Sequence, residues 1–413
     1  MALGVNVVMG QGIFLLPGVA AAMLGPAAIG ALLLAALIAC LIALCFAEVG
    51  ARFRTTGGAY VYARETFGPF IGFEVGWMVC CVAVISWAAL AIGFTEVVST
   101  LVPAVGVGWL QSVVAIGLML VLAGANMFGA KLGATISTVF SIAKLLPVAL
   151  FIAVGLFHVR QDLFSPFAPH GYERLAETTL LLLYAFVGFE SSVVPAGEMK
   201  NPQKAVPVAL MGVMAALCLV YLAIFVIAMG TLPELAGHPN PVAAASEGFM
   251  GSAGGTLVAV GIVVSVFGIN AACTLVAPRK VFAMAERGDL PAAFARVHAG
   301  TGVPRVAIGV ALAVAAALSL TGTFKELAIL GVVARFVQYI PTCIAVLVLR
   351  RRDPSAAGFR IPLGPVVPIA AVCLCAWLIV STDPGKLLGG LAGLLLGVPF
   401  YLLARRRAAG RPT

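Results

Sequence analysis

The sequence predicts an all-α membrane protein with 12 transmembrane helices, of which helices 1 and 6 are broken. Hydrophobic residues make up 62% of the 413 residues, charged residues only 10%, and the mean hydropathy is +1.12. Apolar runs of roughly 18 residues or more recur along the chain, and each is long enough to cross about 30 Å of hydrocarbon as a helix. Glycine-containing interruptions fall inside the first and the sixth of these runs.

The apolar runs give the expected helices in order. Stretches that contain proline, glycine and charged residues separate them, as expected of loops. We expect spans near residues 2–24, 27–50, 69–98, 109–126, 132–157, 174–197, 206–230, 253–284, 303–321, 326–349, 364–382 and 386–404. The first run has no charged n-region and no small-residue cleavage site, so we expect it to be a retained span rather than a signal peptide.

The placement of positive charge predicts the orientation. If the N-terminus is cytoplasmic, about nineteen lysines and arginines, Lys280 among them, fall on the inner side. The outer loops then hold Arg160, Arg174, Lys325 and Lys386. The positive-inside rule therefore predicts that both termini are cytoplasmic. The formal net charge of +9 reflects this topology, and we expect no nucleic-acid partner.

The sequence contains no pattern typical of a catalytic or metal site. The nine cysteines fall in predicted spans without a zinc-binding spacing, and the four histidines lie in loops. No hydrolase elbow, phosphate loop or dinucleotide fingerprint is present. We therefore expect a protein that is not an enzyme and that uses no cofactor and no metal.

The two interruptions occupy corresponding places, five spans apart. They are Gly10-Gln11-Gly12 in span one and Val187-Gly188-Phe189 in span six. Such a pair is typical of an inverted repeat with a substrate site at the midplane. Non-helical backbone is tolerated at this depth only where it lines a cavity or is buried in protein. Free amides suit a carboxylate and free carbonyls suit an ammonium, although glycines that merely permit close helix packing are the alternative.

Several motifs in the same order resemble those of one transporter superfamily. They are "GQGIFLLPG" in span one, "FAEVGARFRTTGGAYVYARETFGPFIGFEVGW" after span two, "AFVGFE" and "GEMKNPQKAVPVA" around span six, and "RKVFAMAERGDLPAAFARVH" after span eight. Together they are similar to the signatures of the amino acid/polyamine/organocation (APC) superfamily of permeases. The resemblance covers nearly the whole chain.

This resemblance implies a LeuT-type fold with a five-plus-five inverted repeat. The transporter core would occupy residues 1–350, with spans one to five in 1–157 and the inverted repeat in 174–350. Residues 351–413 would form two peripheral spans and a basic cytoplasmic tail. The implied activity is the movement of an amino acid or related amine across the inner membrane by alternating access.

The resemblance also implies a set of substrate contacts. The substrate carboxylate would meet the backbone at Gln11 and Gly12, and its ammonium would meet carbonyls near Val8, Phe186 and Val187. Gln11 departs from the family pattern, where a small serine or alanine is usual, so its amide would either reach the carboxylate or shrink the pocket. The residues expected to line the side-chain pocket, with helix packing as their alternative role, are Tyr184, Trp87, Asn270, Cys273 and Gln338.

Three ionisable residues inside spans are candidates for coupling and gating. Lys144 lies about 18 Å from either end of span five, too deep to reach the interface, so it is either a coupling group or a structural cation. By the resemblance, a lysine here replaces the ion of sodium-coupled relatives. Glu190 follows the second break, where we expect it to lie near water. It either carries a proton or only accepts hydrogen bonds. Arg335 either snorkels outward from span ten or pairs with an acid in a gate.

Three functions are compatible with these residues. The first is a sodium-independent amino acid transporter that works as a proton-coupled symporter or as an antiporter. The second is an antiporter or exporter of a polyamine or decarboxylated amine, and the third is a non-transporting sensor or a channel. The expected partners are a small-molecule amino acid, protons and membrane lipids, with the protein a monomer or homodimer. The few charged groups predicted in the pocket favour a neutral substrate.

Overall fold

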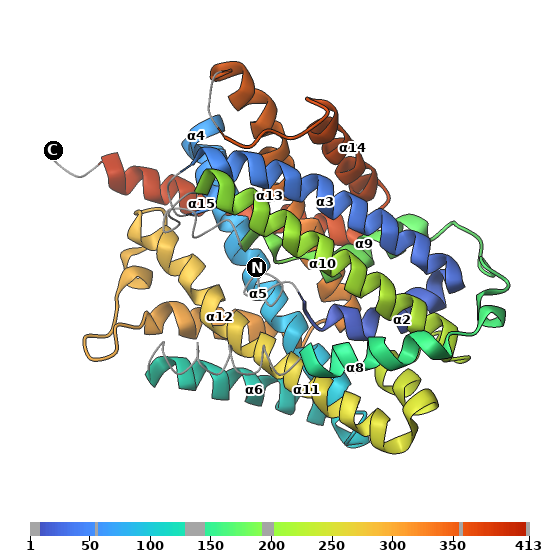
Figure 1. Cartoon of the computed structure of the whole chain (residues 1–413). Helices are drawn as coiled ribbons and strands as arrows, with labels where there is room; N and C mark the ends of the chain where they lie inside the picture. Colours follow the sequence, from blue (N-terminus) through green and yellow to red (C-terminus); the bar gives the residue numbers. More distant parts are fainter. Residues whose placement is uncertain (1–8, 54–56, 129–144, 192–201, 355–357, 410–413) are drawn as a thin grey trace.

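The described part of the chain is helical and contains no strand. The computed structural model describes residues 9–53, 57–128, 145–191, 202–354 and 358–409. Its elements (Figure 1) are α2 Gly12–Leu24, η1 Gly25–Ala27, α3 Ala28–Arg52, α4 Ala59–Phe67, α5 Pro69–Val98, η2 Pro103–Gly106, α6 Gly108–Phe128, α8 Leu145–Gly155, η3 Leu156–His158, η4 Gln161–Phe164, α9 Leu175–Leu183, η5 Tyr184–Phe186, α10 Pro202–Thr231, α11 Pro241–Glu286, η7 Ala292–Ala295, α12 Arg305–Ser319, α13 Phe324–Arg352, α14 Val366–Val380 and α15 Pro384–Ala409.

The long helices have the length and composition of membrane spans. Seven helical stretches of the described residues are long and apolar enough to cross a bilayer, and the first of them, Gly12–Arg52, joins α2, η1 and α3. Three shorter apolar helices are Leu145–His158, Arg305–Ser319 and Val366–Val380. Each helical segment overlaps a run predicted from the sequence, so the all-α class and the membrane setting agree with the prediction.

Both predicted interruptions coincide with helix ends. Helix α2 begins at Gly12, directly after the first interruption, while Val8 lies outside the described residues. Helix α9 ends at Leu183 and passes through the short η5 into extended backbone at Val187, where ψ is 149°. Gly188 follows with φ at 111°, a conformation that only glycine adopts readily. The second break is therefore built into the backbone.

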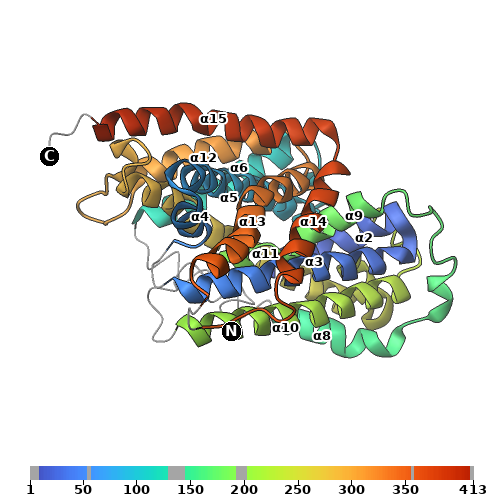
Figure 2. The same ribbon diagram turned by 90° about the horizontal axis from the view of Figure 1, so that it is seen from above.

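Helix α5 is the central scaffold of the bundle. It is buried along most of its length and packs against α4, α6, α11, α12, α13 and α15. Helix α15, by contrast, runs along one edge of the molecule (Figure 2) and leaves most of its apolar side chains exposed. A lipid environment accounts for such a surface, because acyl chains cover apolar side chains without the cost that water imposes.

Helix α11 corrects one sequence expectation. Residues 231–252 were expected to form a loop, but the helix already begins at Pro241 and contains a kink at Gly251, where φ is 71°. The segment before the kink is a separate helical piece, and the segment after it corresponds to the eighth predicted span. After α11, the connection to α12 contains the single turn η7.

Residues predicted to share one side of the membrane meet in the structure. At the end predicted to be outer, Lys325 Nζ lies 3.1 Å from Glu177 Oε1, and the amide of Ala27 donates to the carbonyl of Phe167 at 2.8 Å. At the end predicted to be inner, Arg64 Nη1 lies 3.2 Å from Asp289 Oδ2. These pairings join loops that the positive-inside pattern assigns to the same face.

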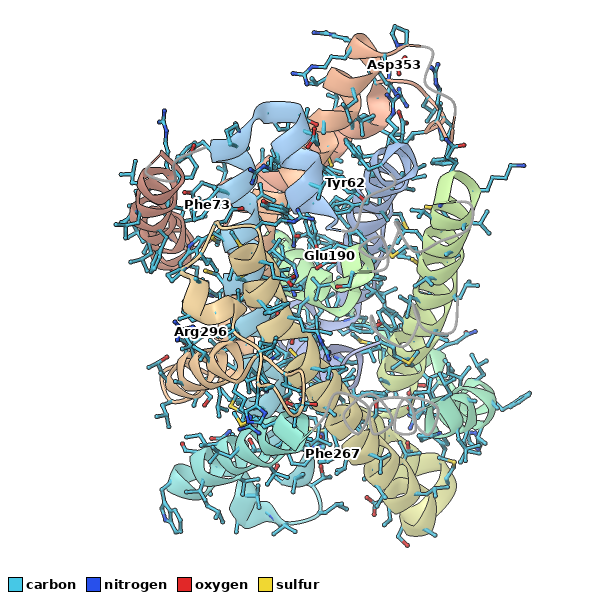
Figure 3. The ribbon with its side chains drawn as sticks, turned by 90° about the vertical axis from the view of Figure 1, so that its left-hand side faces the viewer. Tyr62, Phe73, Glu190, Phe267, Arg296 and Asp353 are labelled. Atoms are coloured by element: carbon cyan, nitrogen blue, oxygen red, sulfur yellow. The ribbon has the colours of Figure 1, made fainter. Side chains whose placement is uncertain are left out.

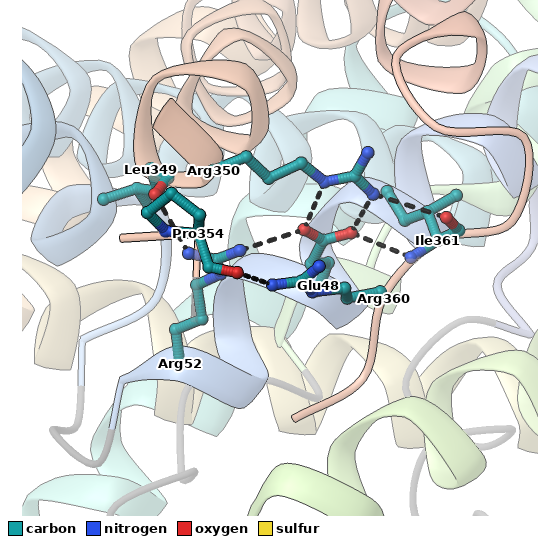
Figure 4. Close-up of polar contacts among 7 residues, drawn as sticks. All are labelled: Glu48, Arg52, Leu349, Arg350, Pro354, Arg360 and Ile361. Atoms are coloured by element: carbon teal, nitrogen blue, oxygen red, sulfur yellow. Dashed lines mark hydrogen bonds and ion pairs between the residues drawn. The ribbon is translucent and has the colours of Figure 1, made fainter. Parts of the chain in front are cut away.

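A buried carboxylate ties the C-terminal ends of α3 and α13 together. The Glu48 side chain is 0% exposed and accepts hydrogen bonds from Arg350 Nε at 2.7 Å and Nη2 at 2.5 Å (Figure 4). Arg52 Nη2 and the amide of Ile361 donate to the same carboxylate at 3.3 and 2.8 Å. The main partner of Glu48, Arg350, is about 300 residues away in the chain and binds the carboxylate through two charge-assisted hydrogen bonds.

Candidate functional site

The end of the first break lies against η5, the short helix that leads into the second break. A Cβ atom added to Gly12 would lie 3.1 Å from Cδ1 of Tyr184 and 3.5 Å from the Cα of Ala185. Glycine at this position therefore lets the first break approach η5 closely. The Tyr221 hydroxyl donates to the carbonyl of Ala185 at 3.0 Å and fixes the second break against α10. The structure thus brings together Gly12, Tyr184 and Phe186, with Val187 and Gly188 next along the chain.

The amide of Gln11 is anchored to α5. Its side chain is fully buried, and Nε2 donates to the carbonyl of Ala89 at 2.9 Å. A Cβ at Gly93 would lie 2.5 Å from the Gln11 Cδ, so the amide rests on the backbone of α5. The Oε1 atom has no hydrogen-bond partner in the described part of the chain. Gln11 therefore offers an acceptor beside the two breaks, and Gly10 is half-buried before it.

Two further predicted pocket residues carry unpaired buried atoms. Trp87 on α5 is 0% exposed, and its indole Nε1 has no partner among the described residues. Asn270 on α11 donates through Nδ2 to the carbonyls of Leu90 and Val266, whereas its Oδ1 has no partner among the described residues. A buried polar atom without a partner costs about 1–3 kcal/mol, so a ligand group that paired with these atoms would be stabilised.

Two other predicted pocket residues contribute mainly to helix packing. Cys273 on α11 is half-buried, and its Sγ lies 3.8 Å from the carbonyl of Ala83 on α5. Gln338 on α13 is buried, and its backbone carbonyl accepts a hydrogen bond from Thr342. Neither of these contacts by itself indicates a ligand.

A buried ion pair connects the second break to α13. Glu190 lies in the middle of the molecule (Figure 3) and is 8% exposed. Its Oε1 accepts from Arg335 Nε at 3.1 Å, and its Oε2 accepts from the amide of Gly188 at 2.9 Å and from the hydroxyl of Tyr339 at 3.2 Å. The expectation that Glu190 lies near water is therefore wrong, because its carboxylate is enclosed by protein donors.

Arg335 does not snorkel outward. It is 5% exposed, and besides Glu190 it donates to the carbonyl of Gly331 at 2.9 Å and to the hydroxyl of Ser86 at 2.9 Å. Of the two expected arrangements, the structure has the pairing with an acid. The guanidinium joins α5, α13 and the segment after η5 in one network.

Sequence reasoning missed two members of this region and assigned a helical lysine of α11 to a loop. Ser86 and Tyr339 are polar side chains within apolar runs, and nothing in their spacing marked them as partners of the ion pair. Lys280 was assigned to the inner loops by its charge, yet it lies inside α11, six residues before the end of the helix. Its position within the predicted span 253–284 was the signal that could have found it. Lys144 lies outside the described residues.

Two cavities lie away from the breaks. A cavity of about 100 Å³ lies among the end of α5, the start of α6, the end of α12 and the segment before α13, and its lining includes Glu96 and Gln111. A wider groove lies between the start of α10 and Phe359. Between the breaks themselves, the ring of Tyr184 occupies the space next to Gly12.

Comparison with known proteins gives the family. A profile for amino acid permeases matches residues 1–386. The methylthioribose transporter of Bacillus subtilis (strain 168) is 30% identical over 427 residues, which cover 98% of this chain and 92% of that protein. From the same organism, the serine/threonine exchanger SteT is 30% identical over 429 residues (99% and 96%), and the branched-chain amino acid permease BcaP is 26% identical over 428 residues (98% and 91%). The family predicted from the motifs is confirmed, and the chain belongs to the amino acid permeases.

Proposed function

We propose that this protein is a secondary active transporter that moves an amino acid across the cytoplasmic membrane by alternating access. The observation that carries the proposal is the close approach of two helix breaks beside buried polar atoms that lack partners. Broken helices at corresponding positions are how transporters of this architecture form a site at the midplane. Relatives named as a serine/threonine exchanger and a branched-chain amino acid permease support an amino acid as substrate.

The proposed architecture has twelve spans. Spans one to five and six to ten form the five-plus-five inverted repeat within residues 1–350, and the last two spans are peripheral. Both termini are cytoplasmic, and the protein is a monomer or homodimer in the inner membrane. The meeting of Gly12 with η5 supports this arrangement, because an inverted repeat brings its first and sixth spans together.

In the proposed site, the α-carboxylate of the substrate meets the amides at the start of α2, and its ammonium meets carbonyls freed at the second break. Two acceptors around it are Gln11 Oε1 and Asn270 Oδ1, and one donor is the indole N–H of Trp87. A small zwitterion satisfies both kinds of main-chain group. A dicationic polyamine fits less well, because the carboxylate of Glu190 already pairs with Arg335.

The proposed coupling is independent of sodium and uses protons or exchange. The Glu190 carboxylate accepts hydrogen bonds from the amide of Gly188 and from Arg335. In the proposed cycle, protonation of the carboxylate weakens both hydrogen bonds, so that the backbone at the second break and the guanidinium can move. Lys144 is the second proposed coupling residue, on the sequence alone. Arg335 acts as a gate when it leaves Glu190 and lets η5 move relative to α13.

Uptake into proteoliposomes tests the proposal. The purified chain is reconstituted in a sodium-free buffer, and labelled serine, leucine, glutamate, lysine and putrescine are offered with and without the same compound inside. We expect saturable uptake of at least one amino acid, accelerated by a proton gradient or by internal substrate. Uptake of putrescine alone would favour the polyamine antiporter, linear uptake without saturation would indicate a channel, and binding without uptake would indicate a sensor.

A further inference from the structure

Glu74 on α5 carries a buried carboxyl group that the proposed mechanism leaves unused. Its side chain is 8% exposed, and neither of its carboxyl oxygens has a hydrogen-bond partner among the described residues. It lies five residues after Pro69, beyond the first turn of α5, so the free amides at the start of that helix do not reach it. Glu74 therefore differs from Glu48 and Glu190, whose carboxylates accept several hydrogen bonds each.

Helix α15 covers this carboxyl group. A Cβ atom added to Gly397 would lie 2.8 Å from Glu74 Oε2 and 2.7 Å from Trp77 Cδ1, so the backbone of α15 lies directly on both side chains. The Trp77 indole donates to the carbonyl of Gly393 at 2.8 Å and stacks on Phe400 with ring centroids 5.0 Å apart. The close contact of the two helices thus keeps water away from Glu74.

The charged residues of α15 lie far from this contact along the helix. Arg405 and Lys386 are eight and eleven residues from Gly397, or roughly 12 and 16 Å along the helix axis. The tyrosine of α15 near this level, Tyr401, packs its ring on Phe73 with centroids 5.3 Å apart. Helix α15 therefore covers Glu74 with backbone and rings and brings no counter-charge to it.

The other helices packed on α5 also supply no partner to Glu74. Helix α4 packs at Gly72, where a Cβ would lie 2.5 Å from the Arg64 Cβ, and the Arg64 guanidinium pairs with Asp289. On α13, Arg335 pairs with Glu190 and contacts Ser86, twelve residues beyond Glu74. Helix α6 has no charged residue. The remaining nearby groups, none of them a hydrogen-bond partner of Glu74, are Cys81 on the same face of α5, Arg279 and Lys280 on α11, and the exposed Arg305 on α12.

We propose that Glu74 is a proton-binding site that makes the packing of α15 on α5 depend on pH. Burying a carboxylate without a counter-charge costs far more than burying a neutral carboxyl group whose hydrogen bonds are unmade. The carboxyl group is therefore protonated while α15 covers it, and it ionises when α15 moves away and water enters. Glu74 lies roughly 8 Å from the end of α5 that is predicted to be inner, so this site responds to the pH of the cytoplasm. The proposal goes beyond the transport function and does not depend on the substrate.

Thermal unfolding of the purified full-length protein and of Glu74→Gln tests the proton site. Glutamine keeps the shape of a neutral carboxyl group and cannot ionise. The folded wild type should hold the proton more tightly than the unfolded chain, so its stability relative to Glu74→Gln is lost as the pH rises. We expect the melting temperature of the wild type minus that of Glu74→Gln to drop by at least about 2 °C between about pH 5 and about pH 8.

The matched control is Glu65→Gln, which removes an exposed carboxylate of the neighbouring α4. Its melting temperature should follow that of the wild type at both pH values. Parallel curves for the wild type and Glu74→Gln would overturn the proposal, because Glu74 would then not titrate differently on unfolding. If Glu74→Gln does not elute as a single species, Glu74→Leu, which also has no charge, takes its place.

Tryptophan fluorescence reports on the packing of α15, because Trp77 lies in the contact. We expect the wild-type emission to move to longer wavelength between about pH 5 and about pH 8, as water reaches the indole. Trp77→Phe should abolish this change, whereas Trp109→Phe should retain it, since Trp109 is 77% exposed at the start of α6. The change should also be absent in Glu74→Gln. A wild-type emission that does not change, or a change that persists in Glu74→Gln, would contradict a proton-dependent contact at Glu74.

Discussion

At the scale of single residues, Glu190 serves two purposes at once. Its carboxylate accepts the amide of Gly188, which the helix break leaves without a helical partner, and it neutralises Arg335. The ring of Tyr339, which donates to the same carboxylate, stacks on Phe189 with centroids 5.6 Å apart. The geometry of the break therefore depends on the charge state of one side chain.

Glu190→Gln should impair both stability and transport. The substitution leaves the guanidinium of Arg335 buried without a counter-charge, and loss of one partner of a buried pair typically costs about 3–5 kcal/mol. We expect a lower melting temperature and a transport rate reduced at least about tenfold, measured by thermal unfolding and proteoliposome uptake. The double variant with Arg335→Gln should regain part of the stability. A single variant with wild-type melting and uptake would contradict this role.

Gly93 is expected to matter because of Gln11. An alanine methyl there would lie 2.5 Å from the Gln11 Cδ and would push the amide off the carbonyl of Ala89. We expect Gly93→Ala to weaken substrate binding by about tenfold while the protein still elutes as a single species. Gly30→Ala is the control, since nothing lies within 4 Å of a Cβ at Gly30. Equal affinities of the two variants would show that the Gln11 amide has no part in binding.

Residue pairing is where sequence reasoning was weakest. The depth of Arg335 and of Glu190 in their spans follows from counting residues, but their separation by 145 positions hides the contact. Pairing with an acid was therefore only one of two alternatives for Arg335. Lys280 was assigned to a loop by its charge, because a sequence gives the depth of a side chain more readily than the direction in which it points.

At the scale of elements, the α3–α13 junction depends on Glu48. Glu48→Ala would remove the acceptor shared by Arg350, Arg52 and the amide of Ile361. We expect destabilisation of about 3 kcal/mol, visible as a lower melting temperature in detergent. Asp162→Ala is the comparison, because the Arg160–Asp162 pair is exposed on both sides and exposed pairs contribute little. Similar effects of the two substitutions would argue against a structural role for burial at Glu48.

The junction of α4 with the loop after α11 should respond to alkaline pH. The Tyr60 hydroxyl donates to Asp289 Oδ2 at 2.6 Å, and Arg64 Nη1 donates to the Tyr60 oxygen at 2.6 Å. Burial, followed by the hydrogen bond to Asp289, raises the pKa of the Tyr60 phenol above its ordinary value of 10.0. The folded protein therefore holds this proton more tightly than the unfolded chain does.

The stabilisation from Tyr60 is complete below the unfolded pKa and is lost as the pH rises through the raised folded pKa. We expect the wild-type melting temperature to fall more steeply than that of Tyr60→Phe as the pH rises above about 10, the ordinary pKa of the phenol. Melting curves recorded at intervals across this range check the difference. Parallel curves for the two proteins would mean that Tyr60 does not titrate differently on unfolding.

Most element boundaries could be predicted because apolar length and turn residues determine them. The break at Gly188 was also predictable, since a glycine between apolar residues at midspan interrupts a helix for a local reason. The helix that begins at Pro241 was not, because residues 241–250 are too few to span a bilayer and lie among proline and glycine residues that also suit a loop. The residue before it, Asn240, is held by the contact of its Nδ2 with the carbonyl of Glu96 on α5. Tertiary contacts of this kind leave no periodic signal.

At the scale of the whole molecule, α5 joins the parts of the site. The carbonyls of Ala89 and Leu90 accept hydrogen bonds from the side chains of Gln11 and Asn270, and the hydroxyl of Ser86 accepts one from Arg335. The three acceptors lie within about one and a half turns of α5. Movement of the broken segments relative to α5 therefore changes these contacts together. Alternating access of the proposed kind requires such a shared reference element.

The two ends of the bundle should face opposite sides of the membrane. The loop that contains Asp162 lies at one end of the long helices, and the loop that contains Arg296 lies with the C-terminal end of α15 at the other (Figure 1). Both side chains are exposed. In intact cells, a membrane-impermeant maleimide should label Asp162→Cys, while Arg296→Cys should react only after permeabilisation. The wild type, with its nine native cysteines, gives the background. The opposite pattern would invert the orientation predicted from positive charge, and labelling of both variants from outside would mean that the helices between them do not carry the chain across the bilayer as proposed.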